Sequence, residues 1–98
     1  MYKLREDEEV IKKVWAKGTV VSNNDPNIWR KDACGAWIKR EKYGDRDSIY
    51  GWEIDHINPD GGDGLSNLRP LHWKNNIATS DGTLKCVITS SGPKNVEK

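Results

Sequence analysis

The chain begins with a pattern typical of an amphipathic helix. Between residues 5 and 17, four apolar residues recur at intervals that place them on one face of a helix. They are Val10, Ile11, Val14 and Trp15. Acidic residues stand at the start of the segment and lysines near its end, an order that complements the helix dipole. The pattern predicts a helix over residues 5–17, with Gly18 as its stop.

The middle of the chain predicts a strand, a loop, a second strand and a short helix. Large apolar residues alternate with polar or small ones over residues 50–56, which is the period of a strand. Glycine, proline and aspartate make residues 58–67 a loop. We expect the second strand over residues 68–73, where Pro70 indicates an edge position. The short helix follows over residues 74–80.

The remaining segments carry weaker patterns. Turn-forming residues fill positions 22–27, and the basic stretch after them is irregular except for extended structure expected around residues 36–40. A β-prone patch covers residues 84–89, and residues 90–98 are expected to be frayed. Together the patterns predict an α+β fold with an N-terminal helix, an irregular basic segment and a strand–strand–helix core.

Length and composition indicate one small domain. The chain has 98 residues, five tryptophans and no phenylalanine, so the tryptophans are expected to supply much of the core. Charged residues make up 32% of the chain, and no apolar run approaches the roughly 20 residues that span a bilayer. The N-terminus lacks the apolar region of a secretory signal. We therefore expect a cytoplasmic protein without a membrane partner.

The two cysteines, Cys34 and Cys86, lie far apart in the sequence and form no CxxC pair. A lone pair of thiols suits a reducing compartment, so no disulfide is expected.

Charge is distributed unevenly although the net charge is only +1. Residues 29–46 contain six basic and three acidic residues, whereas residues 47–81 contain six acidic and two basic ones. A basic segment that leads into an acidic one suits a site where a cation and a phosphate meet. Two solvated faces of opposite sign explain the distribution equally well.

The chemistry-bearing residues gather at the end of the first middle strand. Asp55 and His56 would point to opposite faces of a continuous strand, but the chain bends at Ile57-Asn58-Pro59 and can bring both to one site. A carboxylate with an asparagine carbonyl suits a hard divalent cation. A histidine beside them can take a proton from water. Phosphodiester hydrolysis requires these parts.

Residues 51–82 resemble the HNH, or ββα-metal, nuclease superfamily. Four motifs carry the resemblance: Asp-His-Ile-Asn-Pro at 55–59, Gly-Gly at 61–62, Asn-Leu-Arg-Pro-Leu at 67–71, and an asparagine nine positions after Asn67. The resemblance implies a ββα-metal core at residues 51–82, within a single domain of residues 1–98 that also has an N-terminal extension (1–50) and a C-terminal tail (83–98).

The resemblance also implies residue roles. His56 would be the general base, Asp55 a metal ligand, and Asn67 the residue that holds the loop and the base by hydrogen bonds. Asn76 would complete metal binding, which makes this a His-Asn-Asn variant that favours Mg²⁺ or Mn²⁺ over softer metals. Asn75, one position earlier, remains an alternative ligand.

Many superfamily members hold a structural zinc with two CxxC pairs. The corresponding positions here are Lys31 with Cys34, and His72 with Asn75. Only Cys34 and His72 are competent ligands, whereas structural zinc takes four. We therefore do not expect structural zinc.

The sequence thus predicts a metal-dependent endonuclease that acts on nucleic acid, with DNA as the expected substrate. The candidate phosphate contacts are Lys39, Arg40, Arg69 and Lys74. A domain of this size has little surface for reading base sequence, so we expect weak specificity or a protein partner that supplies it. Two alternatives remain: a non-catalytic nucleic-acid-binding module that keeps the fold, and a small zinc-stabilised interaction domain.

Overall fold

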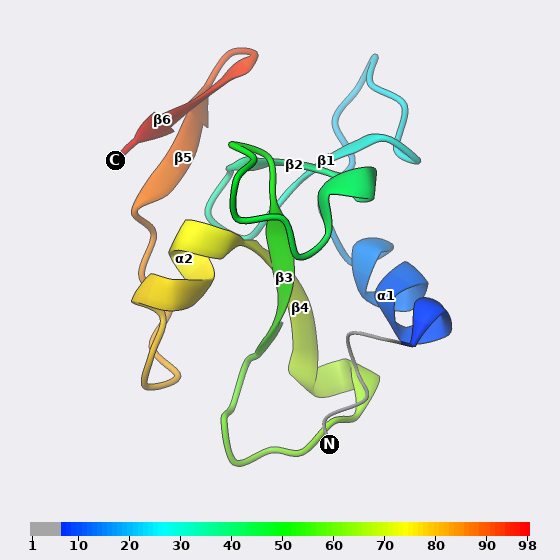
Figure 1. The fold of residues 1–98 in the computed structure, drawn as a ribbon, viewed down its shortest axis with the longest axis vertical. Coiled ribbons are helices and arrows are strands. Elements are labelled where there is room, and N and C mark those ends of the chain that lie inside the picture. The colour runs from blue at the N-terminus through cyan, green and yellow to red at the C-terminus, as the bar shows by residue number, and fades with distance from the viewer. Residues whose placement is uncertain (1–6) are drawn as a thin grey trace.

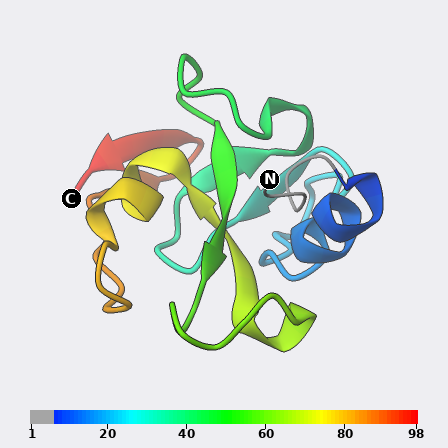
Figure 2. The same cartoon turned by 60° about the horizontal axis from the view of Figure 1, so that its bottom comes forward.

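Residues 7–98 are described by the computed structural model, in which two α-helices and three antiparallel strand pairs form a small α+β domain (Figure 1). The central pair, β3 (Trp52–His56) and β4 (Leu68–His72), lies between the N-terminal helix α1 and the helix α2 (Figures 1 and 2). The α+β class expected from the sequence is therefore confirmed.

The first helix is shorter than predicted. Helix α1 spans Glu8–Trp15, and the Asp7 carboxylate caps it by accepting the backbone N–H groups of Glu9 and Val10. Residues 5 and 6 of the predicted helix lie outside the described residues. After Trp15 the chain tightens into a turn in which the Lys17 and Gly18 N–H groups donate to the carbonyls three residues earlier, and Arg30 donates to the carbonyls of Ala16 and Gly18.

The irregular basic segment contains a strand pair that the sequence predicted only in part. Strand β2 (Trp37–Lys39) matches the extended structure expected near residues 36–40, but its partner β1 (Trp29–Lys31) was not predicted. A 3₁₀ helix, η2 (Arg40–Lys42), follows. Each strand has only three residues, so neither shows a measurable alternation of apolar and polar side chains.

The predicted strand–loop–strand–helix order is present. Strands β3 and β4 pair antiparallel, from Trp52 opposite His72 to His56 opposite Leu68. The loop between them ends in a 3₁₀ turn, η3 (Leu65–Asn67), and α2 (Trp73–Ala78) follows β4 directly. These bounds differ from the predicted ones by two residues or fewer.

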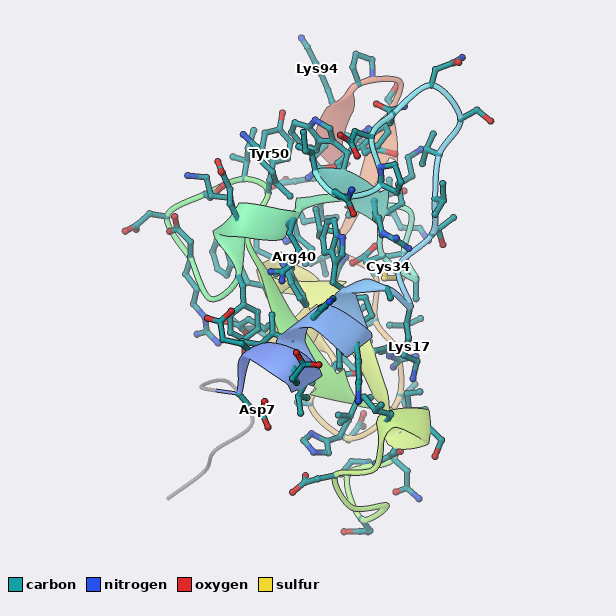
Figure 3. All side chains as sticks on the ribbon, turned by 90° about the vertical axis from the view of Figure 1, so that its right-hand side faces the viewer. Asp7, Lys17, Cys34, Arg40, Tyr50 and Lys94 are labelled. Atoms are coloured by element: carbon teal, nitrogen blue, oxygen red, sulfur yellow. A yellow bond between two sulfur atoms is a disulfide. The ribbon has the colours of Figure 1, made fainter. Side chains whose placement is uncertain are left out.

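The hydrophobic core lies between α1, β2 and the β3–β4 pair. Its buried cluster comprises Ile11, Val14, Trp15, Ile38, Trp52 and Leu68. The rings of Trp15 and Trp52 pack with centroids 5.3 Å apart, so two tryptophans occupy the centre as expected. Lys17 extends from the end of α1 to the carbonyls of Leu65 and Leu68 and so ties α1 to the start of β4 (Figure 3).

The expectation of a frayed C-terminal segment is wrong. Strands β5 (Ile88–Ser91) and β6 (Lys94–Glu97) form an antiparallel hairpin around Gly92, whose positive φ suits the turn. The side chain of Asn95 accepts the backbone N–H of Trp37 and donates to its carbonyl. These contacts anchor the hairpin to β2, a long-range pairing that local sequence does not reveal.

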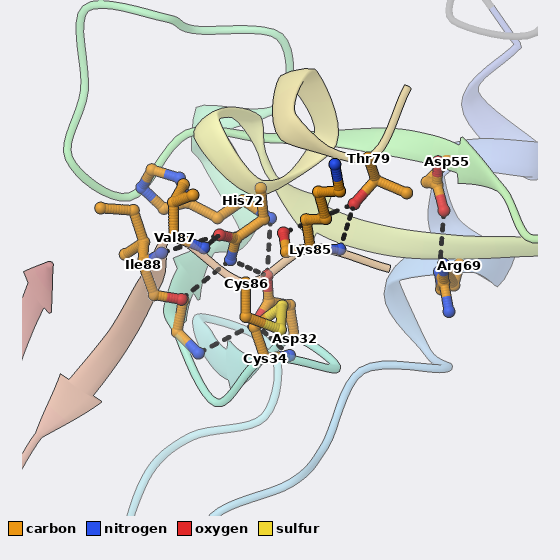
Figure 4. The surroundings of a disulfide bond; sticks show 12 residues. Asp32, Cys34, Asp55, Arg69, His72, Thr79, Lys85, Cys86, Val87 and Ile88 are labelled. Atoms are coloured by element: carbon orange, nitrogen blue, oxygen red, sulfur yellow. Dashed lines mark hydrogen bonds and ion pairs between the residues drawn. A yellow bond between two sulfur atoms is a disulfide. The ribbon is translucent and has the colours of Figure 1, made fainter. Parts of the chain in front are cut away.

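The expectation of free cysteines is also wrong, because Cys34 and Cys86 form a disulfide across a separation of 52 residues (Figure 4). The turn between β1 and β2 carries Cys34, and Cys86 lies just before β5. The fold brings the two thiols together although no spacing motif announces it. Within residues 7–98, neither helix has the length and apolar character needed to cross a lipid bilayer.

Candidate functional site

A cavity of about 370 Å³ lies where β3 ends and α2 passes beside it. The loop after β3 and residues 79–82 after α2 form its other walls. Asp55, His56 and Asn76 all line it, although Asn76 is 20 residues from His56 in the sequence. The antiparallel pairing of β3 with β4, followed at once by α2, is what brings these three side chains to one cavity.

Asp55 is buried, with 6% of its surface exposed, and it forms an ion pair with Arg69 directly opposite on β4. Arg69 Nε donates to Asp55 Oδ2 over 2.8 Å (Figure 4). Among the described residues, Asp55 Oδ1 takes part in no hydrogen bond. Arg69, predicted to contact phosphate, thus engages one oxygen of the predicted metal ligand Asp55.

His56 lies at the last position of β3, and its ring reaches the loop that follows. The ring Nε2 lies 2.7 Å from Oδ1 of Asp63, within hydrogen-bonding distance. This contact fixes the orientation of the imidazole at the cavity wall. Sequence reasoning did not single out Asp63, because the two aspartates in that loop, Asp60 and Asp63, were equivalent as turn formers.

Asn67 holds the loop closed. Its Oδ1 accepts the Asn58 N–H, and its Nδ2 donates to the carbonyls of Asn58 and Gly62. A Cβ at Gly61 would lie 2.8 Å from Asn67 Nδ2, so a larger residue there would displace this amide, whereas Gly62 has open space around it and a positive φ of 82° that favours glycine. The loop-holding contacts predicted for Asn67 are present, whereas its hydrogen bond to the base is not among them. Its catalytic role stays a prediction.

Asn75 and Asn76 have different surroundings. Asn75 is fully buried; its Nδ2 donates to Asp32 and to the Ile88 carbonyl, and its Oδ1 accepts the N–H groups of Val87 and Ile88. Its amide is therefore saturated by structural contacts. Asn76 lines the cavity and donates through Nδ2 to Glu53 Oε1 over 2.9 Å. A cation in the cavity would meet Asn76 rather than Asn75.

Glu53 and Arg46 form an ion pair beside the cavity that sequence reasoning missed. Arg46 Nε lies 2.6 Å from Glu53 Oε2, and Arg46 Nη2 lies 3.0 Å from Glu53 Oε1. The hydrogen bonds that Arg46 donates to Glu53, together with the negative charge of Glu53, raise the pKa of Arg46 above its ordinary value. A single glutamate on a strand has no sequence signal that would have identified this pair.

None of the four predicted phosphate contacts lines the cavity, but Arg69 contacts a residue that does, through its ion pair with Asp55. The other three are Lys39, Arg40 and Lys74. Lys39 pairs with Glu41 over 3.2 Å and lies above the Trp29 ring, and Lys74 lies above the Trp73 ring. Their predicted contacts with nucleic acid would therefore lie away from the candidate site.

The positions that resembled a zinc site carry a hydrogen-bond network. The Asp32 carboxylate accepts the backbone N–H groups of Cys34, Ala36 and His72 and one N–H of the Asn75 amide (Figure 4). His72 Nδ1 accepts the Lys74 N–H, and its Nε2 lies 2.9 Å from the Ile49 carbonyl. Both ring nitrogens of His72 are thus engaged. Burial lowers the pKa of His72 below its ordinary value of 6.5.

The donor set of the cavity suits a small, hard cation. Within residues 7–98, no three histidine, cysteine, aspartate or glutamate side chains are grouped to hold a metal ion. Asp55 and Asn76, which line the cavity, instead carry a carboxylate and an amide oxygen, both of which are ligand types for hard cations. Mg²⁺ is commonly bound through one or two protein oxygens, with water and phosphate completing its shell. The residues present therefore fit Mg²⁺ or Mn²⁺.

Comparisons of this chain with protein-family models, with curated proteins and with solved structures give no match.

Proposed function

We propose that this protein is a metal-dependent endonuclease of the HNH, or ββα-metal, type that hydrolyses phosphodiester bonds in DNA. The observation that carries the proposal is the convergence of Asp55, His56 and Asn76 on one cavity at the junction of β3 and α2. These are the residues to which the motif resemblance gave the metal and base roles. That these three residues line one cavity supports the resemblance independently of the motifs.

Asp55 and Asn76 would hold the cation. Arg69 engages Oδ2 of Asp55 and Glu53 engages Nδ2 of Asn76, so each ligand presents its remaining oxygen. Mg²⁺ or Mn²⁺, when bound, supplies positive charge that stabilises the phosphate and the leaving oxygen.

His56 would act as the general base. A water at the cavity gives a proton to the imidazole while its oxygen attacks phosphorus and the bond from phosphorus to the leaving oxygen breaks. The 2.7 Å contact of Nε2 with Asp63 orients the ring for this transfer. Asn67 keeps the loop that carries Asp63 in place through its three hydrogen bonds.

The basic stretch of the chain and the small size of the domain support a nucleic-acid substrate and a protein partner. The basic stretch of residues 29–46 suits a polyanion, and phosphate contacts of this kind bind without regard to base sequence. We propose that the domain itself has weak specificity for base sequence and that a protein partner supplies this specificity.

The test is cleavage of supercoiled plasmid by the purified protein in Mg²⁺, in Mn²⁺ and in chelator. Cutting is expected with either metal and not with chelator. His56→Ala should lower the rate by about 10²–10⁴-fold with an unchanged melting temperature, because general-base catalysis contributes that much. Asp55→Ala should weaken metal binding, so that added Mn²⁺ partly restores its rate.

Asp60→Ala is the matched control, because Asp60 lies exposed in the same loop and does not line the cavity. It should cut like the unsubstituted protein. Cutting that persists in chelator would contradict the proposal, as would a destabilised His56→Ala protein that cuts at the normal rate. Binding of DNA without cutting in either metal would favour the non-catalytic module.

A further inference from the structure

The Glu53 carboxylate contacts two side chains at the edge of the candidate site, the guanidinium of Arg46 and the amide of Asn76. It lies on β3 two residues before Asp55, so both side chains leave the same face of the strand, toward α2. Its side chain is only 17% exposed. Arg46 donates to both of its oxygens, and Asn76 Nδ2 donates to Oε1.

An asparagine amide can present either its oxygen or its nitrogen to a given side, and its partners decide which. An ionised glutamate only accepts hydrogen bonds, so Glu53 selects the nitrogen of Asn76. The amide oxygen is then on the other branch of the side chain, away from Glu53, and Asn76 lines the cavity. Without Glu53, the Asn76 amide could turn and present N–H groups, which repel a cation.

We propose that Glu53, held in place by Arg46, is a positioning residue that turns the Asn76 oxygen toward the cation site. The inference rests on the proposed function, because it requires Asn76 to be a metal ligand. Glu53 itself is not assigned as a ligand, because both of its oxygens accept hydrogen bonds from Arg46. Arg46 has a distinct part: its two donors, one to each oxygen of Glu53, fix the plane of the carboxylate.

The experiment measures the affinity of the full-length protein for Mn²⁺ by electron paramagnetic resonance, without substrate. Four proteins form a double-mutant cycle: unsubstituted, Asn76→Ala, Glu53→Ala and the combination. Partners that orient a metal ligand are commonly worth about 10–100-fold in metal affinity. We expect Asn76→Ala and Glu53→Ala each to weaken Mn²⁺ binding by about 10-fold or more. In the Asn76→Ala background, Glu53→Ala should have no further effect.

Two comparisons distinguish an effect of Glu53 on the orientation of the Asn76 amide from an effect of lost negative charge and from a loss of folding. Asp47→Ala removes a negative charge from the loop that carries Arg46, and the Asp47 side chain has no hydrogen bond to Asn76. Because Asp47 is exposed and its charge is screened by salt, this variant should bind Mn²⁺ with an affinity within about twofold of the unsubstituted protein. Circular dichroism of each variant establishes that it is folded. Glu53→Asp keeps the carboxylate on a shorter side chain. Its Mn²⁺ affinity should lie between those of the unsubstituted protein and Glu53→Ala.

The outcomes distinguish this inference from the proposed function. If the folded, unsubstituted protein binds no Mn²⁺, or if Asn76→Ala binds it normally, the assignment of the metal site falls and this inference falls with it. If Asn76→Ala weakens binding but Glu53→Ala does not, only the role of Glu53 is overturned. If the two effects add fully, Glu53 acts through its charge and not through Asn76, which also overturns the inference.

Discussion

His72 shows how burial decides what a histidine can do. It is 2% exposed, and both of its ring nitrogens are engaged by backbone groups. Burial lowers its pKa below 6.5, so the folded protein accepts a proton on His72 less readily than the unfolded chain does. Between the lowered pKa and 6.5, the unfolded state therefore binds more protons than the folded state.

The protein should consequently lose stability as the pH falls below 6.5 and gain it as the pH rises through that window. The slope from this one proton is at most about 1.4 kcal/mol per pH unit. Urea unfolding at a series of pH values measures it. His72→Gln should be less stable at neutral pH, and its free energy of unfolding should fall less steeply on acidification. An identical slope in both proteins would contradict the role given to His72.

Asp32 connects two elements that are far apart in the sequence. Its carboxylate accepts two backbone N–H groups from the β1–β2 turn, and it also accepts from His72 and Asn75 at the start of α2. Asp32 is 4% exposed, so water cannot replace these bonds readily. The position of α2, and with it Asn76, therefore depends on a residue in another element.

Asp32→Ala should lower the free energy of unfolding by about 3 kcal/mol or more, because it leaves several buried donors without an acceptor. Asp25→Ala is the matched control: Asp25 Oδ1 accepts one N–H, from Asn27, in an exposed turn. Its loss should cost about 1 kcal/mol or less. Urea unfolding of both variants provides the comparison, and equal losses would contradict the central place of Asp32.

The sequence predicted elements where an apolar period is long enough to be read. Helix α1 and strand β3 have five or more residues of clear period, and both were predicted. Strand β1 has three residues, too few for a local signal. The β-prone patch predicted over residues 84–89 covers only the first two residues of β5, and the β5–β6 hairpin depends on Asn95 contacting Trp37. Chain segments that fold through distant partners cannot be identified from their own residues.

The same distinction holds for the candidate site. Asp55, His56 and Asn76 belong to spaced motifs, and all three line the cavity. Glu53 contacts Asn76, and Asp63 contacts His56. These two contacts exist only after β3, the loop and α2 have packed together. No spacing in the sequence indicates such partners, because the fold and not the local chain selects which carboxylate is near.

At the scale of the whole molecule, the Cys34–Cys86 disulfide closes a large loop. Closure of a loop of this length restricts the unfolded chain and is worth about 4 kcal/mol on the chain-entropy model. Reduction should therefore lower the melting temperature markedly. The combined Cys34→Ala and Cys86→Ala variant should melt at the lower temperature whether or not reductant is added. An unshifted melting temperature after reduction, with loss of the bond verified by mass spectrometry, would contradict the structural importance of the disulfide.

Every residue of the candidate site lies between the two cysteines. A protease that cuts the exposed loop after β3 would separate Asp55 and His56 from Asn67 and Asn76 along the chain. The first fragment would carry Cys34 and the second Cys86, so the two fragments would remain one covalent molecule. The cut protein would migrate as two bands on a reducing gel and as one band without reductant. This chain can thus be divided into two complementary halves that stay joined while they share one site.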